Sequence, residues 1–146
     1  MPLDITQRNA TRNQSTADYN LSRIFIFDNR FVEGIFKNTS GATADHQGCM
    51  LVARSTAVVD GLIPVTTLNL ADVIGVSAYD GTVSLANNAT ANINYCSKGT
   101  IDGTMLILPA TVTLNTVVGN KTLRDVLESL GLHVDTSAVD NTKYDN

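Results

Sequence analysis

The sequence predicts a mainly β protein, a small β-barrel or sandwich that carries one short amphipathic helix near its C-terminal end. Two observations predict this fold class. Short runs of β-branched and other apolar residues recur between residues 24 and 118, and Asp-Gly or Asn-rich turns separate them. One later segment instead repeats its apolar residues with the period of a helix.

Composition favours one folded domain. The chain has 146 residues, of which 43% are hydrophobic and 16% charged, and its formal net charge is −4. This balance argues against disorder of the whole chain. The acidic excess argues against nucleic acid as the main partner, because phosphate binding needs a clustered basic face. The apolar runs are too short to span a bilayer, and the N-terminus lacks the layout of a secretion signal, so we expect no membrane partner and synthesis in the cytoplasm.

The first segment, residues 1–22, differs from the rest of the chain. It is rich in Thr, Asn, Gln and Arg, and its few apolar residues follow neither the strand period nor the helix period. Such a segment buries too little surface to offset its ordering entropy. Residues 1–37 carry a net charge of +1, whereas residues 39–146 carry −5. We therefore predict an extended N-terminal arm (1–22), a β-rich domain (23–134) and a polar C-terminal tail (135–146).

The β-rich domain is predicted from its short apolar runs. The first two runs are separated by Asp28, Asn29 and Arg30, which favour a turn. Lys98 and Gly99 are expected to separate two later runs in the same way. A short helical turn is expected at 69–73. The predicted strands lie at 24–27, 31–36, 48–53, 57–59, 63–65, 73–78, 82–85, 92–96, 105–108 and 111–118.

The helix is predicted over residues 120–132. Thr122 is placed to cap its N-terminal amides, with Asp125 three residues later, and Gly131 supplies the left-handed residue that ends it. We expect this helix to cover an open end or edge of the barrel. Its apolar stripe consists of Leu123, Val126, Leu127 and Leu130.

Signals for catalysis or metal binding are weak. Cys49 and Cys96 are expected to be free thiols that behave as small hydrophobic residues. His46 and Cys49 have a ligand-like spacing, but no second such pair follows, so no metal or other cofactor is predicted. Asp45 and His46 are the only adjacent acid–histidine pair, and we interpret them as part of a solvated loop; His133 is expected to be partly exposed. The protein is therefore not predicted to be an enzyme.

The order of several short motifs resembles that of a known protein family. Residues 38–41 form a polar break, 48–51 open a strand, Ile74-Gly75-Val76 follows, and 95–99 leads into Ile101; Leu108-Pro109 and the helix at 123–127 complete the order. This layout, over about residues 38–132, resembles the small capsid decoration (cement, or head-stabilising) proteins of tailed bacteriophages, of the lambda type.

The resemblance implies a β-tulip-like body and a function in the virion. Members of that family bind the major capsid protein on the outer surface of the expanded capsid, as homotrimers at three-fold and quasi-three-fold positions, and stabilise the head against internal DNA pressure. The arm would then grip the capsid subunits. Its apolar residues would fill pockets and its arginines would meet carboxylates; these capsid-binding candidates are Leu3, Ile5, Arg8, Arg12, Tyr19, Leu21 and Arg23.

Two other functions remain open from the residues. The first is a β-barrel receptor- or glycan-binding module of a phage tail or fibre. The absence of Trp and the presence of only four Tyr make it less favoured, since such modules stack aromatic rings on sugars. The second is an enzyme, and it rests only on Asp45, His46 and Cys49.

Overall fold

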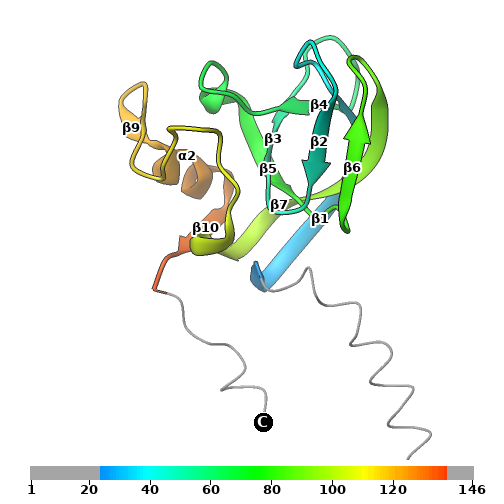
Figure 1. The fold of residues 1–146 in the computed structure, drawn as a ribbon. Coiled ribbons are helices and arrows are strands. Elements are labelled where there is room, and N and C mark those ends of the chain that lie inside the picture. Colours follow the sequence, from blue (N-terminus) through cyan, green and yellow to red (C-terminus); the bar gives the residue numbers. More distant parts are fainter. Residues whose placement is uncertain (1–23, 138–146) are drawn as a thin grey trace, which may run out of the picture.

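A five-stranded β-barrel forms the centre of the protein (Figure 1). It is seen in a computed structural model, which describes residues 24–137. The strand order is β1-β4-β3-β5-β7, and β7 pairs with β1 to close the barrel, which confirms the predicted β-barrel. The strands are β1 (Phe25–Lys37), β3 (Leu51–Arg54), β4 (Gly61–Pro64), β5 (Val73–Ser77) and β7 (Thr90–Asp102).

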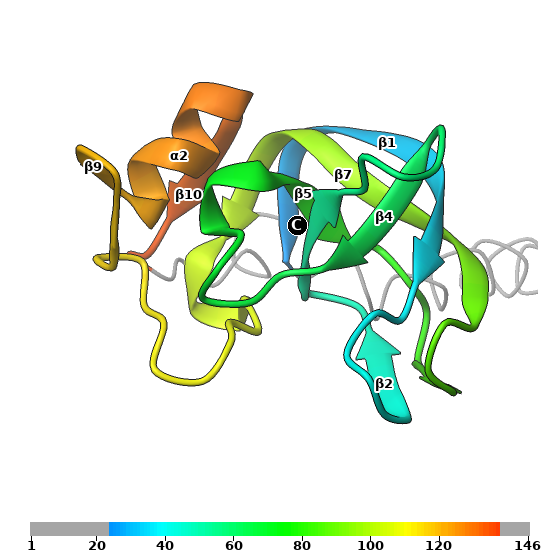
Figure 2. The ribbon, with the colours of Figure 1, turned by 90° about the horizontal axis from the view of Figure 1, so that it is seen from above.

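Smaller elements lie on opposite sides of the barrel (Figures 1 and 2). On one side, β2 (Ala44–Gln47) pairs with β6 (Thr82–Leu85). On the other side lie the helix α2 (Leu123–Leu130) and the small pair β8 (Val117–Val118) and β9 (Lys121–Thr122). Strand β10 (Leu132–Asp135) extends the main sheet by pairing in parallel with β7. Two 3-10 helices, Leu70–Asp72 and Gly103–Met105, lie in connections, and the first confirms the predicted helical turn.

The predicted helix is confirmed, with the predicted caps, but it is shorter than the predicted range 120–132: α2 spans Leu123–Leu130. Thr122 and Asp125 form a capping box, in which each side chain accepts a hydrogen bond from the backbone of the other residue. Gly131 ends the helix with φ of 98°, a left-handed conformation that glycine adopts without steric cost. Leu123 and Leu127 are fully buried and join the core under β5 and β10. The helix thus covers the edge of the sheet at β10, as expected.

The predicted turn at residues 28–30 is wrong, because β1 runs through it as one strand. Asp28 has φ of 50°, and the pairing with β7 changes register between Phe27 and Phe31. Bulges accommodate turn-forming residues within a strand, so their local preference bends the strand and does not end it. The predicted separator at Lys98 and Gly99 is wrong for the same reason, since β7 continues to Asp102.

Three predicted strands are also corrected. Residues 57–59 form a loop in which Val59 is 86% exposed, and 105–108 contain the end of a 3-10 helix and one isolated bridge. Of 111–118, only Val117 and Val118 are in a strand. In these runs the only pairings within residues 24–137 are the bridge of Ile107 to Met50 and the two-residue pairing of Val117 and Val118 with β9, so local β preference did not extend into longer strands.

Two hydrophobic cores fill the fold. The larger one joins the barrel to the helix, and Ile24, Leu51, Val76 and Ile101 are among its buried residues. The smaller one fills the other part of the barrel, around Phe36, Val52, Leu62, Leu85, Ile93 and Tyr95. In residues 24–137, neither α2 nor any shorter helix has the length and apolar character needed to cross a membrane.

Candidate functional site

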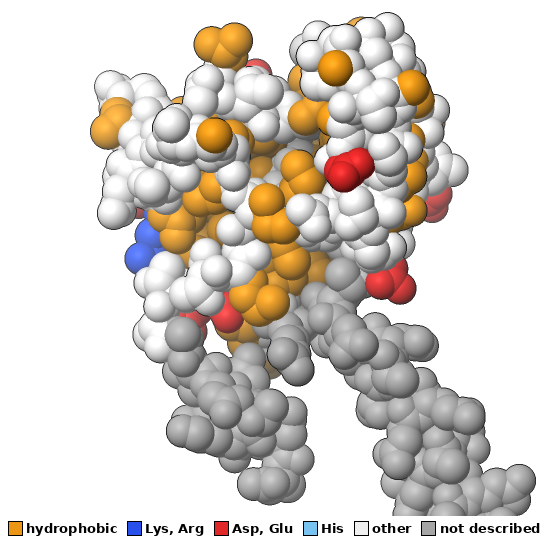
Figure 3. Space-filling model, viewed as in Figure 1, with side chains coloured by type: hydrophobic (Ala, Val, Ile, Leu, Met, Phe, Trp, Pro, Cys, Tyr) orange, Lys and Arg blue, Asp and Glu red, His pale blue; other side chains and the backbone are white. Residues whose placement is uncertain are grey.

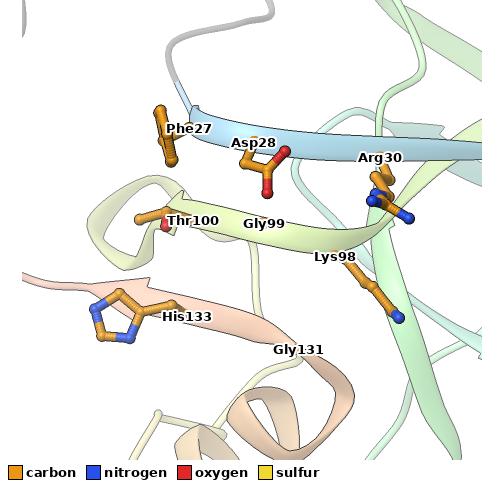
Figure 4. Close-up of a pocket in the computed structure, with 8 residues that line it drawn as sticks. All are labelled: Phe27, Asp28, Arg30, Lys98, Gly99, Thr100, Gly131 and His133. Carbon is orange, nitrogen blue, oxygen red and sulfur yellow. The ribbon is translucent and has the colours of Figure 1, made fainter.

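A hollow of about 330 Å³ lies where β1, β7 and β10 meet (Figure 4). It is open to solvent and combines two cations with an exposed aromatic ring, so we call it the basic–aromatic hollow. In Figure 4, Arg30 and Lys98 lie at one end and Phe27 and His133 at the other. Its lining residues are Phe27, Asp28, Arg30, Lys98, Gly99, Thr100, Gly131 and His133.

Strand register positions these residues. Phe27 of β1 and His133 of β10 are both register partners of Thr100 on β7, so they flank it from opposite sides. Gly99 of β7 lines the hollow where β1 and β7 approach closely. A Cβ on Gly99 would lie 2.6 to 2.9 Å from atoms of Asp28 and Asn29. A side chain at that position would collide with β1, so glycine keeps the two strands close beneath the hollow.

The charges of the hollow are unusual. Arg30 lies directly opposite Lys98 in the antiparallel register, and like charges at such positions repel. Within residues 24–137, Arg124 forms an ion pair with Glu128 at 3.6 Å, and His133 Nδ1 lies 3.5 Å from the same carboxylate. Arg30 and Lys98 therefore have no carboxylate within 4.0 Å in the described part of the chain, although Asp28 lines the same hollow.

An exposed apolar row on β1 continues from the hollow. Phe27 is 72% exposed and Phe31 is 50% exposed, and Ile35 is also exposed. The rings of Phe25 and Phe31 pack edge to face with their centroids 5.1 Å apart, and this contact orients the exposed ring of Phe31. Figure 3 shows that apolar side chains also form a band across the face of the body seen in Figure 1. The surface thus presents much apolar area for a small protein.

His46 is not in a solvated loop, so that interpretation is wrong. It lies on β2 with 1% of its surface exposed, its ring stacks on Phe36 at 4.1 Å between centroids, and its Nε2 lies 2.8 Å from Ser77 Oγ. Burial lowers the pKa of His46 to about 4. This burial could not be predicted from local pattern, because the four residues of β2 are mostly polar and show no apolar period.

The His46–Ser77 pair has the atoms of a catalytic base and a nucleophile, but a substrate has no access to them. Ser77 is fully buried, so a substrate cannot reach its hydroxyl in this conformation. In the described residues, this pair adds to Asp45 and Cys49, on which the enzyme hypothesis rests. Within residues 24–137, no three His, Cys, Asp or Glu side chains are grouped as metal ligands.

The two cysteines are free, as expected. Burial raises the pKa of both the Cys49 and the Cys96 thiol. The Cys96 thiol also donates to the backbone oxygen of Lys98 at 3.0 Å, and Asn29 Nδ2 donates to its sulfur at 3.4 Å. The Asn29 side chain, which also donates to the backbone oxygen of Thr100 at 3.2 Å, thus ties β1 to β7 next to the hollow.

The predicted capsid-binding residues cannot be placed beside this site. All seven, from Leu3 to Arg23, lie outside the described residues, and so does the part of the polar tail beyond residue 137. The residues that sequence reasoning missed are Phe27, Arg30 and Lys98. The first was read as strand and the other two as parts of turns, and no local signal shows that positions 30 and 98 meet.

Comparison of the chain with models of known protein families and with curated proteins found no match.

Proposed function

We propose that this chain is a structural virion protein that binds the outer surface of the expanded phage capsid as trimers and stabilises the head against internal DNA pressure. One observation carries most weight in its support. The exposed apolar row of β1 begins with Phe27, close in sequence to the predicted arm (1–22) and separated from it only by residues 23–26. Arm and row would then form one continuous binding surface.

The row has the character of a protein interface. Outward residues of a barrel strand are ordinarily polar, yet Phe27, Phe31 and Ile35 are exposed along β1 with Glu33 among them. Aromatic residues and arginine are enriched where proteins bind one another, and Arg30 lies within the row. A partner protein that covers the row would remove this apolar surface from water.

The arm supplies reach and avidity in this proposal. About 20 extended residues span roughly 65–70 Å at ~3.3 Å per residue. Such a segment can add a strand to a sheet edge of the major capsid protein, with its backbone hydrogen bonds giving affinity. Three arms on one trimer make the second and third contacts intramolecular, which raises avidity ~10²–10⁴-fold per link. Binding only to the expanded lattice then stabilises that lattice by mass action.

Deletion of residues 1–22 tests the proposal. The test uses purified expanded heads that lack the protein, and measures bound copies by sedimentation and cryo-electron microscopy. We expect the full chain to occupy three-fold positions, and the truncated chain to remain folded but to bind at least about tenfold more weakly. A chain that lacks only residues 138–146 is the control and should bind like the full chain.

Two results would contradict the proposal. Unchanged head binding by the chain without residues 1–22 would remove the arm from the function. Failure of the full chain to bind heads, together with clear hits on a glycan array, would favour the receptor- or glycan-binding module instead.

A further inference from the structure

We propose that the basic–aromatic hollow binds an acidic segment of the protein that this chain decorates. Arg30 and Lys98 would hold its carboxylates, and Phe27 would pack against apolar residues next to them. The identity of the partner rests on the proposed function, but the binding chemistry rests on the hollow itself.

The placement of the two cations is the first argument. Arg30 and Lys98 are register partners on neighbouring strands, where like charges repel each other. Other pairs along the same two strands join residues of which at most one is charged, such as Glu33 with Asn94 and Lys37 with Thr90. A carboxylate bound between the two cations would turn this repulsion into two attractions.

Asp28, the acidic residue that lines the hollow, does not already pair with the two cations. Asp28 lines the hollow, and Figure 4 places it between the two ends, over Gly99. Its carboxylate forms no ion pair within 4.0 Å among residues 24–137. Two permanent positive charges thus face one negative charge, and the cationic end of the hollow has capacity for an incoming anion.

The aromatic end selects a protein segment over a nucleic acid. Phe27 is 72% exposed and lines the hollow at the end away from the two cations. Nucleic acid binding depends on many cations that follow a phosphate backbone, whereas this hollow has two in a chain of net charge −4. A peptide that carries acidic and apolar side chains together matches both ends.

The position of the hollow makes it face the partner. Phe25 of β1 and Val134 of β10 flank the same residue of β7, Ile101, so the first and last strands lie at one end of the sheet. The described chain begins at Ile24 and ends at residue 137 on this side of the body (Figure 1). The predicted arm of residues 1–22 is therefore joined to the body on the side where the hollow lies.

Charge reversal of both cations tests the proposal on heads. The double variant Arg30→Glu with Lys98→Glu keeps two like charges opposite each other on β1 and β7. The repulsion between these positions is therefore similar in variant and wild type, and we expect both to fold. The control is Lys37→Glu with Lys121→Glu, which changes the net charge equally at residues that do not line the hollow. We expect the hollow variant to bind heads at least about tenfold more weakly at low salt, and the control within about twofold.

Salt dependence gives a second readout in the same assay. The affinity of the wild type should fall as salt rises, and that of the hollow variant should fall less, because its carboxylate contacts are gone. Thermal melting shows whether both variants remain folded. Equal weakening of hollow variant and control would overturn the proposal, since total charge would then explain the effect.

A peptide titration separates this proposal from the proposed function. The probe is a short synthetic peptide of alternating Glu and Phe, added to ¹⁵N-labelled full chain. We expect the amide signals of Phe27, Arg30 and Lys98 to shift, and the shifts to disappear in the hollow variant. If wild type binds no heads while these shifts occur, the proposed function fails and the carboxylate site stands.

Three outcomes of the titration would overturn the site. The first is the absence of shifts at these residues. The second is equal shifts with a peptide that has Lys in place of Glu, because only the apolar end would then bind. The third is tighter binding of a single-stranded DNA oligonucleotide at the same residues, because the partner would then be a nucleic acid.

Discussion

The Nε2 atom of His46 lies 2.8 Å from the Oγ atom of Ser77, and both side chains are buried. The other ring nitrogen, Nδ1, has no hydrogen-bond partner within residues 24–137. A charged imidazolium needs two acceptors for its two N–H groups, whereas a neutral ring can leave one nitrogen without a donor at lower cost. The fold therefore holds His46 in its neutral form.

This arrangement predicts a loss of stability in acid. Burial lowers the pKa of His46 from 6.5 to about 4. Between these values the unfolded chain takes up a proton that the folded chain does not, so the free energy of unfolding falls as pH falls from 6.5 towards 4. The total loss from this group is on the order of 3 kcal/mol.

Urea unfolding at several pH values between 7 and 4 measures the effect. The variant His46→Gln should lose much less stability over this range than the wild type. His133→Gln serves as the control for removal of a histidine, because the side chain of His133 is 65% exposed whereas that of His46 is buried. Parallel curves for wild type and His46→Gln would contradict the assignment.

Gly75, on β5 beside its partner strand β7, predicts a second effect on stability. A Cβ at this position would lie 2.4 Å from the carbonyl oxygen of Cys96 and 2.6 Å from the ring of Tyr95. Backbone cannot move aside as a flexible side chain can, so Gly75→Ala should cost about 2 kcal/mol or more. The control Gly81→Asn, in a left-handed turn with no atom within 4 Å, should cost less than about 1 kcal/mol. Similar costs in chemical denaturation would be evidence against this contact.

The capping box predicts a smaller effect at the start of α2. Thr122 Oγ1 accepts from the Asp125 backbone at 3.3 Å, and Asp125 Oδ2 accepts from the Thr122 backbone at 3.2 Å. Thr122→Ala removes the first bond and should lower the free energy of unfolding by about 1 kcal/mol. Thr122→Ser keeps the hydroxyl and should stay within about 0.5 kcal/mol of the wild type. If both variants lose the same stability, the cap is not the cause.

The helix and its cap show which features could be predicted from sequence. Residues 122–131 contain their own signals: an apolar stripe, a capping pair three residues apart and a terminal glycine. The β class was predictable for a similar reason, since short β-branched runs and turns are local. In the helix, and in the predicted runs that did form strands, local preference agrees with the final fold.

The hollow shows what could not be predicted. Phe27, Arg30 and Lys98 meet because β1 and β7 are continuous through residues whose local preference is for turns. That outcome depends on pairing between segments about 70 residues apart, with bulges that absorb Asp28 and its neighbours. His46 was missed likewise, because its burial comes from β6 and from Phe36, neither of which is local to it.

The Arg30–Lys98 pair gives the last prediction, a stability that improves when the hollow is made less basic. In a double-mutant cycle of Arg30→Gln and Lys98→Gln, the coupling in the wild type should be unfavourable by ~0.2–1 kcal/mol at low salt and should vanish at high salt. The control cycle uses Lys37→Gln with Thr90→Val, a registered pair with one charge, and should show no coupling. A favourable coupling between Arg30 and Lys98 would mean that the two side chains do not repel each other, and the hollow would then lose its main reason to attract a carboxylate.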